Sequence, residues 1–205
     1  MEMNYKFNEI EDADEYEISE ITDIILLSNQ TSLIAKLGKN FVKKFIKLCI
    51  VSKHVNLFTL CSGKTNIAYA IFFKKEKLII QELSKLKYLI ILTIIFKLKF
   101  NLLYNILLIY FRKDISLKSE TNTYDIPNSV NLTYLAVKAS HRRKGIGRIF
   151  IENILKKNYS NQYISVETDN KKTLNFYTKY LNFKIIGSRK RFYNNLYLLI
   201  KKNNL

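Results

Sequence analysis

A chain of 205 residues, of which 48% are hydrophobic, is long enough to bury one full core and too apolar to be a disordered tail. Its net charge of +17 is uneven, because residues 1–23 hold nine of the 17 acidic residues and one of the 34 basic ones. The basic remainder attracts polyanions such as nucleic acid, an anionic membrane or a phosphorylated cofactor, although solvated lysine faces explain it equally well.

The cysteines and the N-terminus indicate a compartment. Cys49 and Cys61 stand in apolar surroundings, without metal-binding or redox spacing. We expect buried free thiols, which fit a reducing, cytoplasmic compartment. The stretch MEMNYKFNEIEDADE lacks the basic and apolar regions of a signal peptide.

The first part of the chain predicts a strand, two helices and a hairpin. YKFNEI predicts a short strand, while EYEISEITDIILLSNQ and SLIAKLGKNFVKKFIKLCI predict helices. Their apolar residues recur at helical spacing: Ile18, Ile21, Ile25 and Leu26 in the first, and Phe41, Phe45 and Leu48 in the second. The next stretch, VNLFTLCSGKTNIAYAIFFKK, predicts two strands joined at Gly63.

Residues 83–111 form an apolar insertion. Lys97, Lys99, Asn101 and Asn105 interrupt it, so no uncharged stretch is long enough to cross about 30 Å of hydrocarbon. We expect two helices with a break near residues 97–101. Packing on the core, a homodimer contact and contact with a membrane surface all remain open as its role.

The last part of the chain alternates strands and helices. It predicts strands over 129–137 and 162–167, helices over 145–157 and 171–181, and a closing hairpin in FKIIGSRKRFYNNLYLLIKK. The expected core stripe of the first helix is Ile146, Ile149, Phe150, Ile154 and Leu155. No repeat or linker divides the chain, so residues 1–205 predict a single α/β domain.

The turn between the strand ending at Val137 and the following helix carries a basic, glycine-rich run. Only five glycines occur in the chain, and Gly145 and Gly147 both lie here, directly after three basic residues. A helix N-terminus offers unpaired N–H groups and a partial positive charge, and glycine lets a ligand approach the backbone. The run therefore predicts a phosphate cradle, with an ordinary glycine turn as the alternative.

Two other phosphate motifs do not fit this run. A dinucleotide fingerprint is met by Gly145, Gly147 and Glu167, but its third small position is Phe150, and too little chain follows. A P-loop is excluded for this run because no Gly-Lys-Ser/Thr follows it.

The run resembles the acyl-coenzyme A loop of the GCN5-related N-acetyltransferases (GNAT family). The family pattern Arg/Gln-x-x-Gly-x-Gly/Ala is met by Arg142, Gly145 and Gly147, between a strand and a helix. The downstream family pattern is met by Asn170, Phe176, Tyr177, Lys179 and Phe183 in DNKKTLNFYTKYLNF. Asn182 replaces the usual glycine before Phe183, and asparagine also tolerates a left-handed backbone.

The resemblance implies a mixed, mostly antiparallel sheet flanked by helices, with the helical insertion around 83–111 added to it. It also implies acetyl-CoA as co-substrate. It assigns coenzyme binding to Leu135, Val137, Arg142, Arg143, Lys144, Gly145, Ile146, Gly147, Arg148 and Asn170. In this assignment the N–H groups from about Arg143 to Arg148 hold the pyrophosphate, and the three basic side chains pair with the 3′-phosphate. Leu135, Val137 and Asn170 contact the pantetheine arm, and Tyr177 gives a proton to the leaving thiolate.

No general base can be named from the sequence. The strand NLTYLAV has no carboxylate and offers only Thr133 and Tyr134. Glu120, Asp125 and Glu167 are near the motifs in sequence, but nothing places them at a reaction centre.

No metal is expected, and neither histidine has a predicted role. His54 lies far from the motifs, and His141 stands at a position that the family leaves variable.

The predicted function is acetyl transfer from acetyl-CoA to a primary amine of a small molecule or amino sugar. A protein N-terminus or lysine is the second acceptor class, and a catalytically silent basic binding module is the alternative of another kind. A specific nucleic-acid partner is not expected, because the basic residues are spread through every element and no nucleic-acid-binding motif occurs.

Overall fold

The computed structural model describes residues 5–28, 32–74, 84–86, 88, 129–191 and 194–203. Its strands form one seven-stranded sheet. The strand order is β1-β2-β3-β4-β5-β7-β6, and the β4–β5 pair is parallel while the other pairs are antiparallel. In chain order the elements are β1 (Tyr5–Glu9), α1 (Glu15–Ser28), α2 (Leu33–Leu37), α3 (Lys39–Val51), β2 (Val55–Ser62), β3 (Thr65–Phe73), β4 (Ser129–Val137), η1 (Ala139–His141), α7 (Ile146–Asn158), β5 (Tyr163–Thr168), α8 (Lys171–Asn175), η2 (Phe176–Tyr180), β6 (Lys184–Arg191) and β7 (Asn194–Lys202). This arrangement confirms the predicted mixed, mostly antiparallel sheet.

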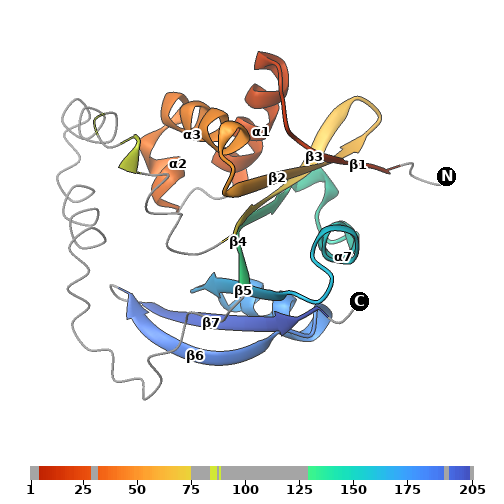
Figure 1. The fold of residues 1–205 in the computed structure, drawn as a ribbon, viewed down its shortest axis with the longest axis vertical. Coiled ribbons are helices and arrows are strands. Elements are labelled where there is room, and N and C mark those ends of the chain that lie inside the picture. The colour runs from red at the N-terminus through yellow and green to blue at the C-terminus, as the bar shows by residue number, and fades with distance from the viewer. Residues whose placement is uncertain are drawn as a thin grey trace.

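Helices cover both faces of the sheet (Figure 1). On one face, α1, α2 and α3 pack on β2 and β3 around Phe41, Phe45 and Tyr69. On the other face, α7 packs around Phe150 and Phe72. Both layers follow from the strand alternation, which sends neighbouring side chains of β3 to opposite faces. Helix α7 therefore lies on the face opposite α1 and α3, and the loop before it follows the end of β4.

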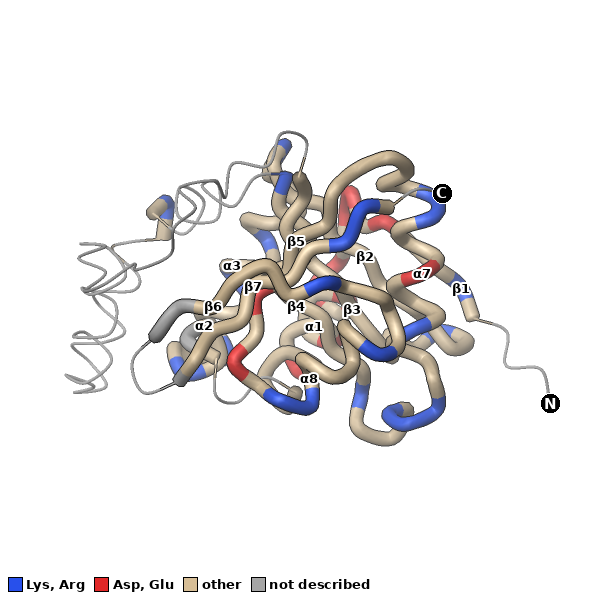
Figure 2. Tube along the Cα trace, turned by 90° about the horizontal axis from the view of Figure 1, so that it is seen from below, with Lys and Arg blue, Asp and Glu red and all other residues tan. Residues whose placement is uncertain are grey.

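Basic residues are distributed widely over the described chain. Figure 2 shows Lys and Arg on helices, strands and turns rather than along a single element. This distribution agrees with the sequence-based expectation, and the absence of a specific nucleic-acid partner stays a prediction.

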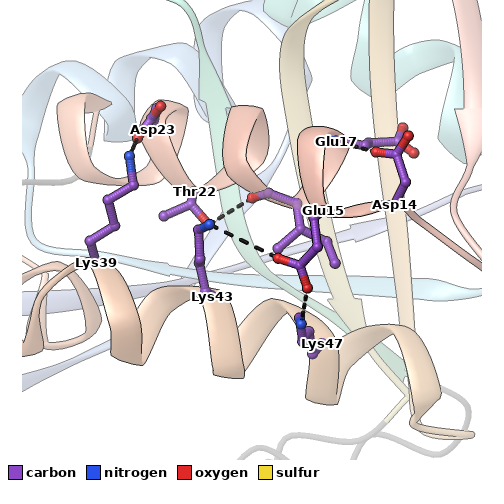
Figure 3. Close-up of polar contacts among 9 residues, drawn as sticks. Asp14, Glu15, Glu17, Thr22, Asp23, Lys39, Lys43 and Lys47 are labelled. Carbon is purple, nitrogen blue, oxygen red and sulfur yellow. Dashed lines mark hydrogen bonds and ion pairs between the residues drawn. The ribbon is translucent and has the colours of Figure 1, made fainter.

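Surface ion pairs join α1 to α3 (Figure 3). Lys39 Nζ lies 2.8 Å from Asp23 Oδ1, and Lys43 Nζ lies 4.0 Å from Glu15 Oε2. Lys47 also pairs with Glu15, and its hydrogen bond and charge lower the pKa of that carboxyl group. These pairs are exposed, so each adds little stability, but they match acidic residues of α1 to the lysine face of α3.

The helix predicted over SLIAKLGKNFVKKFIKLCI is wrong as a single element. Gly38 separates α2 from α3, and its φ of 96° is a conformation that favours glycine. The N–H of Gly38 donates to the carbonyl of Ala35 at 3.0 Å, which ends α2 before α3 begins.

The predicted core stripe of α7 is wrong at one position. Ile149 is 47% exposed, whereas Ile151, which is not part of the predicted stripe, is fully buried in the core beside α7. At the other end of the helix, the buried amide of Asn203 donates to the carbonyls of Leu155 and Tyr159 at 2.7 and 2.8 Å. These bonds fasten the C-terminus of α7 to the end of β7 and so help to fix the direction of the helix.

The cysteines differ slightly from expectation. Neither forms a disulfide, but Cys49 is buried whereas Cys61 is only half-buried. Within the described ranges, no helix is long and apolar enough to cross a membrane. The expected helices of the 83–111 insertion fall outside the described residues, apart from 84–86 and 88.

Candidate active site

The parallel strands β4 and β5 separate after three paired residues. Pairing runs from Ser129 with Tyr163 to Asn131 with Ser165. Beyond that point β4 remains paired with β3 as far as Val137, and β5 remains paired with β7 as far as Thr168. Among the described residues, no strand covers the β5-facing edge of β4 from Leu132 to Val137. Figure 1 shows the two parts of the sheet diverging from this contact.

A β-bulge marks the same place. Ile71 of β3 pairs with Tyr134, but Phe72 pairs with Leu132, so Thr133 is the extra residue. A bulge bends and twists a strand locally. The bulge thus turns β4 away from β5 directly after their last paired residues.

The backbone of β4 points its hydrogen-bonding groups alternately to β3 and to the uncovered edge. The N–H of Lys138 donates to the carbonyl of Ile67 at 2.7 Å, which identifies that residue pair as hydrogen-bonded. In an antiparallel ladder such pairs alternate with non-bonded ones. The backbone groups of Leu135 and Val137 therefore point away from β3, toward the edge that β5 leaves open.

Five successive backbone N–H groups follow in the loop and in the first turn of α7. In the described part of the chain, no group accepts a hydrogen bond from the N–H of any residue from Arg143 to Gly147. The N–H of Arg148, in contrast, donates to the carbonyl of Gly145 at 3.0 Å. The unpaired N–H groups and the helix dipole together make an anion-binding feature.

Left-handed residues give this loop its shape. Gly145 has φ 74° and is the N-cap of α7, and Arg143 has φ 59°. No side chain caps the helix, so its first N–H groups remain open. A Cβ at Gly145 would meet no atom within 4 Å, and glycine is therefore favoured by backbone conformation rather than by space.

Gly147 is close to two other elements of the site. A Cβ there would lie 3.5 Å from Val137 Cγ2 and 3.6 Å from Phe176 Cζ. The start of α7, the end of β4 and the start of η2 therefore meet at Gly147. The glycine leaves room there without needing a positive φ.

The four basic side chains of the run differ in their contacts. Arg142 donates from Nε to the carbonyl of Val137 and from Nη2 to Ser28 Oγ, both at 2.8 Å. Arg148 pairs with Glu152 at 2.9 Å. Arg143 and Lys144 are exposed, and neither has an ion-pair partner among the described residues. These two side chains are the ones available to an anionic ligand.

Tyr177 lies in a buried aromatic group. It is 4% exposed, and its ring centroid lies 5.3 Å from those of both Phe176 and Phe183. Burial raises the pKa of its phenol well above the ordinary value, because the phenolate would lose its hydration. Because of this raised pKa, the phenol is protonated at neutral pH. Its hydroxyl has no hydrogen-bond partner among the described residues.

The helix that carries Tyr177 differs from the predicted one. Instead of one helix over 171–181, α8 is followed by the wider turn η2. Asn182 has φ 58°, as its replacement of glycine requires, and the N–H of Phe183 donates to the carbonyl of Tyr177 at 3.0 Å. Wide helical turns of this kind are frequent at functional sites.

Asn170 is the N-cap of α8. Its Oδ1 accepts from the N–H groups of Lys172 and Thr173 at 2.8 and 3.2 Å. The oxygen is therefore used within the protein, and the amide nitrogen is the part of the side chain that can donate to a ligand.

Among the described residues, no general base is identified. Glu120 and Asp125 lie outside the described residues. Glu167 lies on β5 two residues after Ser165. Because Val166 between them packs with α7, strand alternation places Glu167 on the face opposite α7, which also carries Ser165.

A polar group that sequence reasoning missed lies where β4 and β5 separate. Thr133 Oγ1 donates to Asn131 Oδ1 at 2.7 Å, and Asn131 Nδ2 donates to Ser165 Oγ at 3.1 Å. The signal was present in the sequence as three polar residues among apolar neighbours, Val130, Leu132, Ile164 and Val166, but their contact depends on the strand register.

Comparison with known proteins identifies the class. The model of the acetyltransferase (GNAT) family matches residues 116–183, which include β4, the unpaired N–H groups, α7 and Tyr177. The resemblance to the GNAT family is therefore confirmed, and the chain has the GNAT fold. Members of this family carry out acyl transfer with acetyl-CoA as co-substrate.

Solved structures with the same fold cover nearly the whole chain. One is described as histone acetyltransferase HPA2 and related acetyltransferase from Corynebacterium glutamicum, with a TM-score of 0.61, 14% identity, and 99% of this chain and 98% of that chain covered. Another is the ribosomal-protein-S18-alanine N-acetyltransferase of Escherichia coli, with a TM-score of 0.56, 12% identity and coverage of 98% and 96%. An acetyltransferase structure from Salmonella typhimurium with its cofactor acetyl-CoA has a TM-score of 0.55, 10% identity and coverage of 97% and 93%. No curated protein matches the chain.

Proposed function

We propose that the protein is an N-acetyltransferase that transfers the acetyl group of acetyl-CoA to a primary amine. The observation that supports this most is the row of unpaired N–H groups from Arg143 to Gly147, beside the uncovered edge of β4. Phosphate oxygens are the ligands that such a helix N-terminus prefers. The first N–H groups of any helix are open, but here the loop residues Arg143 and Lys144 extend the row beyond the helix start.

The proposed coenzyme contacts follow the order of these groups. The N–H groups from Arg143 to Gly147 hold the pyrophosphate, and the side chains of Arg143 and Lys144 pair with the 3′-phosphate. Leu135 and the N–H of Val137 bind the pantetheine arm and the thioester oxygen along the open edge. The amide nitrogen of Asn170 donates to the same arm.

Arg142 is proposed to act within the protein rather than on a phosphate. Its guanidinium already occupies the carbonyl of Val137 and the hydroxyl of Ser28. The Arg142 side chain therefore holds Val137, the last residue of β4, in place. The backbone of Arg142 continues into the loop before α7.

Tyr177 is the proposed proton donor. The acceptor nitrogen forms a bond to the thioester carbon, the carbon–sulfur bond breaks, and the thiolate leaves. The thiolate takes the phenolic proton, the phenolate is reprotonated from solvent, and the new amide nitrogen releases its extra proton to water. The raised pKa of Tyr177 keeps the proton on the phenol until a desolvated thiolate of comparable basicity forms beside it.

A small amine or amino sugar is the proposed acceptor. The insertion joins the end of β3 to the start of β4, and those ends lie beside the β4–β5 contact. Its apolar sequence is suited to line the acceptor side. A protein N-terminus or lysine is the other acceptor class to test.

We also propose a cytoplasmic location, which the free cysteines fit.

Two measurements test the proposal together. Acetyl-CoA is expected to raise the melting temperature, because it binds only the native state. Thiol release is then followed with glucosamine, spermidine and a peptide with a free N-terminus and a lysine. Stabilisation with acetyl transfer to any of these supports the enzyme, whereas stabilisation without transfer favours a silent binding module. Absence of any acetyl-CoA binding contradicts the proposal.

A further inference from the structure

The point where β4 and β5 separate carries a fixed hydroxyl group. Thr133 is the bulged residue of β4 and has no partner on β3. It follows Asn131 and Leu132, and the β4–β5 pairing has already ended at Asn131. Its side chain therefore stands near the start of the uncovered strand edge.

This hydroxyl lies on the face opposite the phosphate cradle. Val130 and Leu132 pack with α7, so Asn131 and the Thr133 hydroxyl bonded to it point to the other face. Tyr134, the next residue, contacts Phe45 of α3, with ring centroids 5.9 Å apart. The hydroxyl thus faces the side of the sheet that carries α1 and α3, away from the start of α7.

Neighbouring side chains fix the orientation of the hydroxyl. Asn131 is 5% exposed, and its amide bridges Thr133 and Ser165. Ser165 Oγ donates its only proton toward the carbonyl of Val130, at 3.5 Å, so it must accept from the Asn131 nitrogen. This places the Asn131 oxygen next to Thr133, whose proton it accepts.

The Thr133 oxygen is consequently left as an acceptor. Its proton is used by Asn131, and in the described residues no group donates to the oxygen. A hydroxyl oxygen has two lone pairs, and an amine N–H is a suitable donor for them. No carboxylate belongs to the Thr133–Asn131–Ser165 group, so it can orient an amine but cannot take its proton.

We propose that Thr133 binds the acceptor amine: its hydroxyl oxygen accepts a hydrogen bond from the amine N–H and directs the nitrogen to the uncovered edge of β4. This inference rests on the proposed acetyltransferase function. It assigns the amine to the α1 and α3 side of the sheet, while the coenzyme phosphates lie on the α7 side. Thr133 is a positioning residue that touches the substrate, and Asn131 and Ser165 act by orienting it.

Thr133→Val tests this with little change of shape. Steady-state kinetics are measured with the best acceptor among glucosamine, spermidine and the peptide. We expect KM for the amine to rise about tenfold, since one neutral hydrogen bond is lost. The dissociation constant of acetyl-CoA should remain unchanged in calorimetry. Thr133→Ser keeps the oxygen and should restore KM to within about twofold of the wild type.

Ser165→Ala is the matched control, because it removes a hydroxyl from the same group without removing the proposed amine ligand. A purely structural role predicts equal effects of Thr133→Val and Ser165→Ala on KM, and that result would overturn the inference. An unchanged KM in a folded Thr133→Val protein would overturn it as well. A wild type that binds no acetyl-CoA is a different failure, which removes the proposed function itself.

Discussion

The guanidinium of Arg142 donates a hydrogen bond to the carbonyl of Val137, five residues earlier, at 2.8 Å. Its other end donates to Ser28, the last residue of α1. One side chain therefore joins the end of β4, the loop before α7 and the C-terminus of α1. A cation at a helix C-terminus is also favoured by the helix dipole.

Arg142→Met should lower the free energy of unfolding by about 1 kcal/mol, because two charge-assisted hydrogen bonds are lost at an exposed site. Affinity for acetyl-CoA should fall as well, since the end of β4 is no longer held. Ser28→Ala removes only the bond to α1 and should have the smaller effect on both. Chemical denaturation and calorimetry measure the two quantities, and equal affinity in Arg142→Met and wild type would show that the bond to Val137 is not needed.

The two glycines of the loop should respond differently to alanine. Gly145→Ala places a Cβ on a residue with φ 74° and should cost about 1–2 kcal/mol. Gly147→Ala has no such strain, its Cβ makes ordinary contacts with Val137 and Phe176, and helix propensity improves. Urea denaturation of both variants checks this order of stabilities, which the opposite ranking would contradict.

Tyr177→Phe should reduce turnover by roughly 10²–10⁴ while the affinity for acetyl-CoA changes little. The ring contacts with Phe176 and Phe183 are kept, and the lost hydroxyl has no partner among the described residues, so the fold should be unaffected. Tyr180→Phe is the control, because Tyr180 is 56% exposed on the same turn. Wild-type turnover in Tyr177→Phe would leave this residue a packing role only.

Buried tyrosines should make the protein sensitive to alkali. Burial raises the pKa of Tyr159 and of Tyr177, and Glu9 adds to the shift at Tyr159. In the unfolded chain these phenols ionise near pH 10, so the folded state binds more protons above that pH. Stability is therefore unaffected below about pH 10 and falls above it, by about 1.4 kcal/mol per pH unit for each tyrosine.

Tyr159→Phe tests the alkaline effect. The Tyr159 hydroxyl is buried without a partner among the described residues, so its removal should not destabilise the protein at pH 7. Above pH 10 the variant should lose stability less steeply than the wild type in denaturant titrations. Parallel curves for variant and wild type would rule out Tyr159 as a source of the effect.

The sequence predicted the strands, the position of α7 and the glycine loop, because these depend on local periodicity and on backbone conformation. It did not predict the bond between Arg142 and Ser28, which are 114 residues apart. It also could not place the bulge at Thr133, since a bulge is defined by the register with β3. The error at Ile149 has a similar cause: Ile149 and Ile151 lie on different sides of α7, and which side is buried depends on how the helix packs on the sheet.

The break at Gly38 could have been predicted. Glycine within a helical pattern is a known stop signal, and here its φ of 96° is outside the helical range. The apolar residues before and after Gly38 continue the same helical spacing, so the pattern predicted one helix instead of two.

The cradle itself can be altered through Gly147. Gly147→Asp puts a carboxylate in the first turn of α7, where it competes for the open N–H groups and repels phosphate. Affinity for acetyl-CoA should fall by about 100-fold or more in a folded protein, while Gly147→Ala should keep most of it.

The central claim is that the N–H groups from Arg143 to Gly147 bind the pyrophosphate of acetyl-CoA. Calorimetry with shortened coenzymes tests this claim most directly. The unmodified protein is titrated with acetyl-CoA, with its 3′-dephospho form and with S-acetylpantetheine, which lacks the adenosine as well as the 3′-phosphate and the pyrophosphate. We predict a small loss of affinity, about tenfold, without the 3′-phosphate, because exposed Arg143 and Lys144 provide its contacts. Without the pyrophosphate the loss should be far larger, at least about 1,000-fold. Equal affinity for acetyl-CoA and S-acetylpantetheine would contradict the account.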